Sequence, residues 1–254
     1  MEIEGVAALV TGAGSGMGEM TAQHLAGVGA KVSLVDLNED RVRDVAKRVG
    51  GVPIVCDVSN PASAEETVAK AAEMNGPARI LVNCAGVGRA KRIVGREGPM
   101  PLEEFQRVIN TNLVGSFNML RLAAAAMFPL EPVTASGGKG VIINTASVAA
   151  YEGQIGQAAY SASKGGIVSL TLPAAREFAT QGIRVMTIAP GLIDTPMMAG
   201  MPEEVQESLA SQVPFPKRFG RPQEYASLVE HIITNEMLNG EVIRFDGAIR
   251  MQPK

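Results

Sequence analysis

The sequence predicts a single α/β domain, in which helices cover both faces of a parallel sheet. Short, β-branched apolar runs alternate with longer segments of helical character along the whole chain. The short runs are apolar throughout, which is typical of strands that are buried on both faces. No linker, repeat or low-complexity tract divides the 254 residues, so we expect residues 1–254 to form one domain.

The predicted elements follow one another in strict alternation. We expect strands at residues 6–11, 31–36, 52–56, 80–83, 140–146, 183–189 and 241–245. We expect helices at residues 16–29, 40–49, 61–75, 102–128, 158–181 and 223–234. Such an order produces a doubly wound, Rossmann-like sheet, in which ligands bind beyond the carboxyl ends of the strands.

Three stretches fall outside this alternation, at residues 87–101, 130–139 and 191–220. The first and the third each follow a strand at the carboxyl edge, so we expect them to form walls of a substrate pocket. The stretch 130–139 precedes a strand and is rich in Pro, Ser and Gly, which indicates a surface loop.

Composition and charge argue against several classes of protein. The net charge is −3 and no basic block or acidic tail is present, so nucleic acid is not expected as a partner. The two cysteines and two histidines do not suggest a disulfide scaffold or a His-rich metal site. Residues 1–4 do not resemble a targeting peptide, and Asn118 and Arg121 interrupt the longest apolar helical stretch. We therefore expect no metal, no membrane span and a cytoplasmic location.

A glycine-rich turn follows the first predicted strand, with the order Gly12-Ala13-Gly14-Ser15-Gly16-Met17-Gly18. The spacing G-x-G-x-x-G does not fit it, whereas G-x-x-x-G-x-G does. Glycines allow the main chain to approach a pyrophosphate, and the following helix N-terminus presents free N–H groups. The turn therefore predicts a dinucleotide site that includes Ser15 and Met17, although a plain tight turn remains the alternative.

Asp36 ends the second predicted strand, where a carboxylate can accept hydrogen bonds from an adenosine ribose diol. The same charge repels a 2′-phosphate, and neither Ser15 nor Leu37 supplies a cation to offset it. We therefore predict NAD rather than NADP as the cofactor. The alternative is a helix N-cap or turn residue, because Asn38 and Asp40 follow.

Two further strand ends are candidate cofactor contacts. Asp57 and Val58 close the third strand, where Asp57 can bond the adenine amino group or, equally well, cap the next helix. Cys84 lies among small residues after the fourth strand, which leaves room for a cofactor across the sheet edge. We interpret Cys84 as a packing residue rather than a reactive thiol.

Three side chains form a candidate catalytic group. Tyr160 and Lys164 share a helix face, and Ser147 follows the fifth strand. A free Tyr has a pKa of about 10, which a nearby ammonium and a positive nicotinamide ring would lower. Tyr160 could then take the hydroxyl proton of a small secondary alcohol, Ser147 could hold the oxygen, and Lys164 could also bond the nicotinamide ribose. A Tyr-x-x-x-Lys pair alone also arises on helix surfaces, so its significance depends on the accompanying motifs.

These motifs together resemble the short-chain dehydrogenase/reductase family over nearly the whole chain. The resemblance rests on the glycine turn, Asn83-Cys84-Ala85-Gly86, Ser147, Tyr160, Lys164 and Pro190-Gly191 with Thr195. It implies that Asn112 joins the catalytic group and holds a water in the proton relay, near a local kink of its helix. It also implies that the Ile193 backbone and the Thr195 hydroxyl grip the nicotinamide carboxamide.

Longer strings resemble one subfamily, the type-2 3-hydroxyacyl-CoA dehydrogenases. They are Gly153–Tyr160, Ser211–Pro216 and Asp246–Pro253, together with Pro173, which is expected to kink its helix at Ser169. This resemblance implies NAD-dependent interconversion of 3-hydroxyacyl-CoA and 3-oxoacyl-CoA, in fatty acid metabolism, by a homotetramer. The stretch 87–101 departs from the subfamily in length and composition.

Several residues on the substrate side carry open alternatives. Gln157 shares a helix face with Tyr160 and is either a substrate contact or a helix-entry cap. Lys91, Arg92 and Arg96 either meet CoA phosphates or belong to a solvated loop. The alanines at 123–126 either pack between subunits, as the family resemblance suggests, or pack only on the sheet.

Three functions remain open at this point. The first is an NAD-dependent 3-hydroxyacyl-CoA dehydrogenase, and the second is a hydroxysteroid or simple secondary-alcohol dehydrogenase with the same catalytic group. The third is a non-catalytic NAD-binding scaffold, against which the intact group of Ser147, Tyr160, Lys164 and Asn112 argues. A reductase acting on acyl carrier protein is disfavoured, because it would normally use NADPH.

Overall fold

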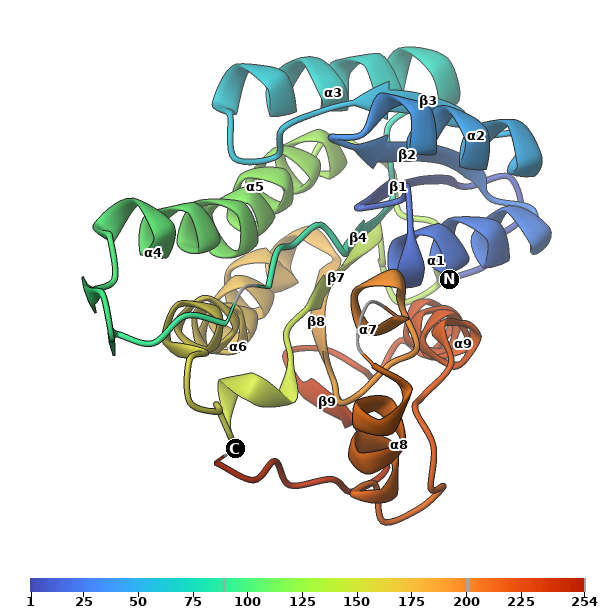
Figure 1. Cartoon of the computed structure of the whole chain (residues 1–254). Coiled ribbons are helices and arrows are strands. Elements are labelled where there is room, and N and C mark those ends of the chain that lie inside the picture. Colours follow the sequence, from blue (N-terminus) through green and yellow to red (C-terminus); the bar gives the residue numbers. More distant parts are fainter. Residues whose placement is uncertain (89, 200–201, 254) are drawn as a thin grey trace.

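The chain folds around one seven-stranded parallel sheet with the strand order β3-β2-β1-β4-β7-β8-β9 (Figure 1). The computed structural model describes residues 1–88, 90–199 and 202–253. The predicted α/β, Rossmann-like class is therefore confirmed. The strands of this sheet are β1 Ala7–Thr11, β2 Lys31–Asp36, β3 Val52–Val55, β4 Ile80–Asn83, β7 Gly140–Thr145, β8 Ile183–Pro190 and β9 Val242–Phe245.

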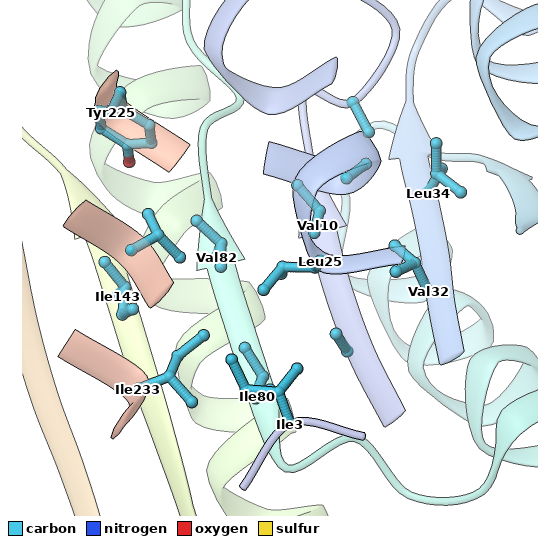
Figure 2. Packing of buried hydrophobic residues seen from close by; sticks show 14 of the residues in the cluster. Ile3, Val10, Leu25, Val32, Leu34, Ile80, Val82, Ile143, Tyr225 and Ile233 are labelled. Atoms are coloured by element: carbon cyan, nitrogen blue, oxygen red, sulfur yellow. The ribbon is translucent and has the colours of Figure 1, made fainter. Parts of the chain in front are cut away.

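Helices cover both faces of the sheet. The helices α1, α2 and α9 pack on one face and α3, α5 and α6 on the other, each face with its own apolar cluster. Figure 2 shows part of the first cluster, where Leu25 of α1 and Ile233 of α9 meet Val10 and Ile80 of the sheet. The main helices are α1 Gly16–Gly27, α2 Glu39–Val49, α3 Pro61–Asn75, α4 Leu102–Ile109, α5 Gly115–Met127, α6 Ala158–Phe178, α8 Glu203–Ser211 and α9 Pro222–Thr234.

The central strands show why their sequences contain consecutive apolar residues. In β4, Ile80 and Val82 belong to the cluster on one face, whereas Leu81 belongs to the cluster on the other. Successive side chains of a strand point to opposite faces, so a strand covered on both sides needs apolar residues throughout. The continuous runs therefore predicted the sheet correctly.

The long helix predicted at 102–128 is interrupted. A π-helical turn, Asn110–Val114, separates α4 from α5, so the local kink expected near Asn112 is present. The helix predicted at 158–181 ends instead at Phe178 and is followed by a short 3-10 turn. It continues through Pro173, and the kink expected at Ser169 stays a prediction.

The two predicted pocket-wall stretches contain structure of their own. The first holds a hairpin of β5 Val94–Gly95 and β6 Gly98–Pro99, and the second holds α8 and the short α7 Pro196–Ala199. Position 89 in the first stretch and positions 200–201 in the second lie outside the described residues. The pattern of buried apolar residues could not predict these elements, because the hairpin is mostly exposed and α8 has no buried residue.

The chain order reverses between β1 and β4, which are neighbours at the centre of the sheet. Their carboxyl ends, with those of β7 and β8, form the edge at which ligands bind in such folds. Within the described ranges, no helix is long and apolar enough to cross a bilayer. Among the same residues, no group of three or more His, Cys, Asp or Glu could hold a metal ion.

Candidate active site

The glycine turn after β1 is packed so closely that side chains are excluded from it. Gly12 has a φ of +65°, and a Cβ there would lie 2.7 Å from the Ala85 nitrogen. A Cβ on Gly18 would overlap the carbonyl oxygen of Gly12. Gly16 also has a positive φ, of +58°. These three positions of the motif therefore require glycine for physical reasons.

The N-terminus of α1 opens from this turn without a side-chain cap. Ser15 occupies the N-cap position in extended conformation, and its side chain makes no capping hydrogen bond. Gly16, Met17 and Gly18 form the first turn, where the N–H groups have no partner within the helix. This arrangement fits the pyrophosphate of a dinucleotide, because the donors and the positive end of the helix dipole face the same point.

Asp36 lies directly beside the glycine turn. Its Oδ2 accepts a hydrogen bond of 2.9 Å from the Gly14 nitrogen, and its Oδ1 accepts one of 2.9 Å from the Asn38 nitrogen. The N-cap of α2 is Asn38, which accepts from the Arg41 nitrogen, so the N-cap alternative for Asp36 is wrong. The carboxylate does close a turn, and it also stands where an adenosine ribose would meet the glycine turn.

The two candidate residues after β3 differ in burial. The exposed Asp57 accepts from the nitrogen and hydroxyl of Ser59, while Asn60 caps α3, so the helix-cap alternative for Asp57 is wrong. Val58 is buried, and its carbonyl accepts from the Asn118 side chain. The adenine-side contacts assigned to Asp57 and Val58 stay predictions.

Cys84 is enclosed by hydroxyl groups behind the cofactor edge. Its Sγ lies 3.6 Å from the Thr145 hydroxyl and 3.7 Å from that of Tyr225. Burial, which outweighs these contacts, raises the pKa of the Cys84 thiol. A thiol with a raised pKa is a poor nucleophile, so this geometry favours a packing role.

Ser147 and Tyr160 meet at the carboxyl edge of β7. The Ser147 Oγ accepts from the Ala149 nitrogen at 3.1 Å, and its hydrogen bond with Tyr160 lowers the pKa of the phenol. Burial has the larger effect and leaves the pKa of Tyr160 raised. Desolvation disfavours the phenolate in the protein alone, so the lowered pKa expected with a nicotinamide ring bound stays a prediction.

Lys164 lies one helical turn after Tyr160 and is almost fully buried. Its Nζ is 5.8 Å from the centre of the Tyr160 ring and donates a 2.7 Å hydrogen bond to the Thr145 carbonyl. Burial lowers the pKa of Lys164 to about 8. A buried ammonium at this place is costly, which is typical of a group held for chemistry.

Asn112 sits in the π-helical turn and joins two parts of the site. Its side chain bonds both the nitrogen and the carbonyl of Val87, at 2.8 and 3.0 Å, and donates to the Ser163 hydroxyl at 3.0 Å. A Cβ on Gly86 would lie 3.3 Å from its Oδ1 and 3.6 Å from the Lys164 Nζ. The π-helical turn thus directs a buried amide toward the helix that carries Tyr160 and Lys164.

The segment after β8 closes over the glycine turn. Ile193 is buried and pairs with Gly220, and a Cβ on Gly16 would lie 3.4 Å from the Thr195 side chain. Ile193 and Thr195 therefore stand near the predicted dinucleotide path. Their specific grip on a carboxamide stays a prediction.

Gln157 occupies the N-cap position of α6 without making a capping hydrogen bond. Its Oε1 instead accepts from the Gln154 nitrogen at 3.0 Å and closes the turn before the helix. Gln157 is therefore a helix-entry residue by position but not a side-chain cap, and the substrate contact stays a prediction. The site also contains Ser163, which donates to the Tyr160 carbonyl at 2.7 Å. Ser163 lies three residues after Tyr160, a spacing that places the two residues side by side on a helix, so the sequence spacing could have identified it.

Comparisons with known proteins agree with this geometry. A family model described as short chain dehydrogenase matches residues 6–206. The chain is 52% identical to 3-hydroxyacyl-CoA dehydrogenase type-2 of Bos taurus, with 99% of this chain and 97% of that protein covered. It is 50% identical to the protein of the same name from Drosophila melanogaster, with 99% and 100% covered. The crystal structure of 3-hydroxyacyl-CoA dehydrogenase type-2 from Mycobacterium avium matches with a TM-score of 0.93 at 39% identity, and 98% of each chain is covered. The chain belongs to the short-chain dehydrogenase family and is an oxidoreductase.

Proposed function

We propose that this chain is an NAD-dependent dehydrogenase that interconverts 3-hydroxyacyl-CoA and 3-oxoacyl-CoA. The observation that carries the proposal is the meeting of Tyr160, Ser147 and Lys164 beside a glycine turn that excludes side chains. The substrate class comes from relatives of about half-identical sequence, which are named 3-hydroxyacyl-CoA dehydrogenase type-2. NAD is supported by the Asp36 carboxylate beside the turn.

The side chains divide the work as follows. NAD, when bound, supplies the acceptor for hydride in alcohol oxidation, and NADH supplies the donor in the reverse direction. Tyr160 as phenolate accepts the hydroxyl proton of the substrate, and as phenol it returns that proton to the ketone oxygen. Ser147 donates a hydrogen bond to the same oxygen, on which charge changes during the reaction.

Lys164 and Asn112 support the phenol. The protonated Lys164 favours the phenolate of Tyr160 and can bond the nicotinamide ribose. Burial works against the phenolate in the protein alone. A positive nicotinamide ring, when bound, would add to the influence of Ser147 and Lys164 in lowering the pKa of Tyr160. Asn112 is held by Val87 and Ser163, and we propose that it positions a water through which the proton reaches solvent.

A CoA group would need cationic side chains near the pocket. Lys91, Arg92 and Arg96 are exposed on the segment around the β5–β6 hairpin. The main-chain nitrogen of Lys91 donates a hydrogen bond of 2.8 Å to the Gly156 carbonyl, which places this segment against the start of α6. We propose that these cations meet CoA phosphates, since they combine exposure with proximity to the Tyr160 helix.

Two groups of residues in and next to α5 bear differently on the expected homotetramer. Ala123 and Ala124 pack on the sheet of their own subunit, so the alternative of intramolecular packing holds for these two. Val114 and Phe117, near the start of α5, are 42% and 46% exposed and would be covered by a partner subunit. We propose a homotetramer, which light scattering can test, whereas the cytoplasmic location stays a prediction.

The decisive assay measures NADH oxidation with acetoacetyl-CoA, a steroid ketone and a simple ketone in parallel. We expect acetoacetyl-CoA to give the highest kcat/KM, and NADPH to support little turnover. A preference for the steroid would instead assign a hydroxysteroid dehydrogenase. NADH binding without turnover of any ketone would assign a scaffold.

A further inference from the structure

A short segment at residues 151–157 joins the turn that begins after Ser147 to the helix that carries Tyr160, so it flanks both catalytic side chains in the chain. It lies between η2 Val148–Ala150 and α6, and it includes the half-exposed apolar residues Tyr151 and Ile155. On one side the Gly156 carbonyl accepts from the Lys91 nitrogen. The segment contributes no strand or helix to the sheet layers, so its position depends on contacts with other parts of the chain.

The C-terminal tail supplies most of these contacts. The Ile155 nitrogen donates to the Pro253 carbonyl at 3.0 Å, and the Gln154 side chain donates to the Gln252 carbonyl at 3.0 Å. The Met251 nitrogen donates to Glu152 at 3.2 Å. The last described residues of the chain thus run along the segment 151–157, almost 100 residues away in sequence.

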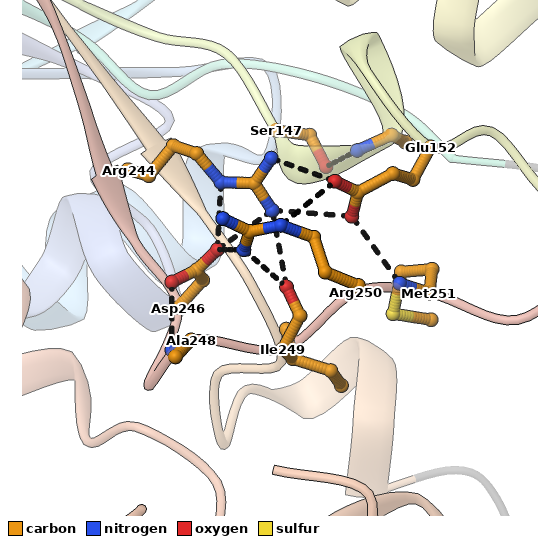
Figure 3. A network of polar contacts seen from close by, with 9 residues as sticks. Ser147, Glu152, Arg244, Asp246, Ala248, Ile249, Arg250 and Met251 are labelled. Atoms are coloured by element: carbon orange, nitrogen blue, oxygen red, sulfur yellow. Dashed lines mark hydrogen bonds and ion pairs between the residues drawn. The ribbon is translucent and has the colours of Figure 1, made fainter. Parts of the chain in front are cut away.

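A cluster of four charges, Glu152, Arg244, Asp246 and Arg250, holds the tail and the segment together (Figure 3). Arg244 forms a fork with both oxygens of Glu152, at 2.8 and 3.1 Å, and also bonds Asp246 at 2.8 Å. Arg250 bonds Asp246 at 3.2 Å and approaches Glu152 within 3.4 Å. Two positive and two negative groups therefore balance within one network, in which the planar guanidinium of Arg244 is central.

The same tail also touches the segment that follows α8. The Phe215 nitrogen donates to the Gly247 carbonyl at 3.3 Å, and a Cβ on Gly247 would lie 2.6 Å from the Val213 side chain. These two residues follow α8. A Cβ on Gly191, at the end of β8, would lie 2.9 Å from the Asp246 Cβ. One network thus links the segment before Tyr160 with the segment after α8.

We propose that Arg244 and Glu152 are positioning residues, which set substrate affinity by fixing the segment 151–157 against the C-terminal tail. This inference rests on the proposed function. The Tyr160 helix has its own support in the Asn112–Ser163 contact, so the proton-transferring phenol stays in place when the cluster is disturbed. The expected effect is therefore on the KM for the ketone substrate and not on kcat or on NADH binding.

The test compares Arg244→Lys, which keeps the charge but loses the fork to Glu152, with wild type. We expect the KM for acetoacetyl-CoA to rise about tenfold, with kcat within about twofold. The dissociation constant for NADH, measured by fluorescence, should not change. Arg43→Lys is the matched control, because Arg43 makes two hydrogen bonds to one oxygen of Glu39 on the exposed side of α2. It should leave all three quantities unchanged.

A second variant separates positioning from simple stability. Glu152→Gln removes the charge at the other end of the fork, and the double variant with Arg244→Lys should raise the KM no further than the larger single effect. If Arg244→Lys fails to fold, Glu152→Gln and a chain ending at Arg250 carry the same expectation of a raised KM. A lowered melting temperature with unchanged KM in these variants would overturn the proposal. Absence of turnover in wild type would instead contradict the proposed function.

Discussion

The two sides of the crevice are built by different means. On the nucleotide side, the glycine turn packs against the main chain after β4 and donates from the Gly14 nitrogen to the Asp36 carboxylate. Gly12, Gly14 and Gly18 leave no room for a Cβ. On the substrate side, the segment 151–157 is held by side-chain charges and by the C-terminal tail. Large apolar side chains there, such as Ile155 and Phe215, remain 50% and 82% exposed.

This difference shows how one fold can keep a cofactor and change substrates. Main-chain contacts in the glycine turn are nearly independent of residue type elsewhere, so they preserve the dinucleotide site. Ion pairs and exposed apolar residues can be replaced with little effect on the core, so the substrate wall can vary. The catalytic side chains Ser147, Tyr160 and Lys164 stand between these two regions.

The largest expected effect comes from Tyr160→Phe, which removes only the phenolic oxygen. We expect kcat/KM for acetoacetyl-CoA to fall by about a thousandfold or more, because proton transfer loses its acid/base group. NADH binding should stay at the wild-type value, since the glycine turn is untouched. Stopped-flow turnover and fluorescence titration measure the two quantities, and substantial remaining turnover would assign the proton to another group.

The second prediction concerns the buried ammonium of Lys164. Its pKa is about 8 in the folded protein, against 10.5 when exposed. Below pH 8, Lys164 is protonated in both the folded and the unfolded protein, so burial of its charge lowers the free energy of unfolding. Above pH 10.5, the side chain is neutral in both states and this penalty is absent. The free energy of unfolding of wild type should therefore gain about 3 kcal/mol relative to Lys164→Met between pH 7 and pH 10.5.

Urea unfolding of both proteins at several pH values measures this gain. The comparison removes any constant penalty that the variant suffers from losing the hydrogen bond to the Thr145 carbonyl. Parallel stability curves for the two proteins would show that Lys164 has an ordinary pKa in the fold. Lys164 would then be more hydrated than the structure indicates.

The sequence predicted the layers of the fold well and the substrate side poorly. The strands at 31–36 and 80–83 have the predicted bounds, because strands buried on both faces carry consecutive apolar residues, such as Leu34-Val35 and Ile80-Leu81-Val82. The helix α8 could not be predicted in the same way, since none of its residues is buried and only Val205, Leu209 and Ala210 of it are apolar. The pattern of apolar residues in the sequence therefore predicted the buried core but not the exposed helix α8.

The candidate site divides in the same way. Tyr160 and Lys164 share one helix, and the glycine turn is continuous in sequence, so their spacing predicted that they act together. The fork between Glu152 and Arg244 joins residues 92 positions apart. Charged residues of this kind follow no periodicity that distinguishes them from a solvated surface, so the cluster is visible only in the structure.

The third prediction tests how closely the glycine turn is packed, by comparing substitutions at two glycines of α1. Gly18→Ala places a Cβ against the Gly12 carbonyl, so we expect stability to fall by about 2 kcal/mol and NADH binding to weaken. Gly27→Ala meets no atom within 4 Å and should be neutral or stabilising by up to about 1 kcal/mol. Thermal unfolding measures the stability and titration measures NADH binding. Equal stability and equal NADH affinity of the two variants would argue against a closely packed turn.

The fourth prediction concerns Asp36. Asp36→Asn should weaken NADH binding about tenfold and reduce the discrimination against NADPH, because the ribose loses a charged acceptor. Asp57→Asn should have a smaller effect, since Asp57 bonds only within its own turn. Titrations with both nucleotides compare them, and a larger effect from Asp57 would reverse the assignment of the two carboxylates.

The smallest effect is expected on the basic segment. Reversing the charges of Lys91, Arg92 and Arg96 to Glu should raise the KM for acetoacetyl-CoA several-fold, about 1 kcal/mol or less per exposed contact. The KM for a ketone without CoA should not change. Equal effects on the two substrates would show that the segment shapes the pocket in general and does not bind CoA.

A crystal structure of the chain with NAD and a bound ketone substrate tests the central claim most directly. The account predicts that the substrate oxygen lies about 2.6–3.2 Å from both the Tyr160 and the Ser147 oxygens, a distance at which protons transfer. Lys164 should lie beside the nicotinamide ribose, and the pyrophosphate should meet the N-terminus of α1. A substrate oxygen held away from Tyr160, or a Tyr160 side chain turned out of the crevice, would contradict it.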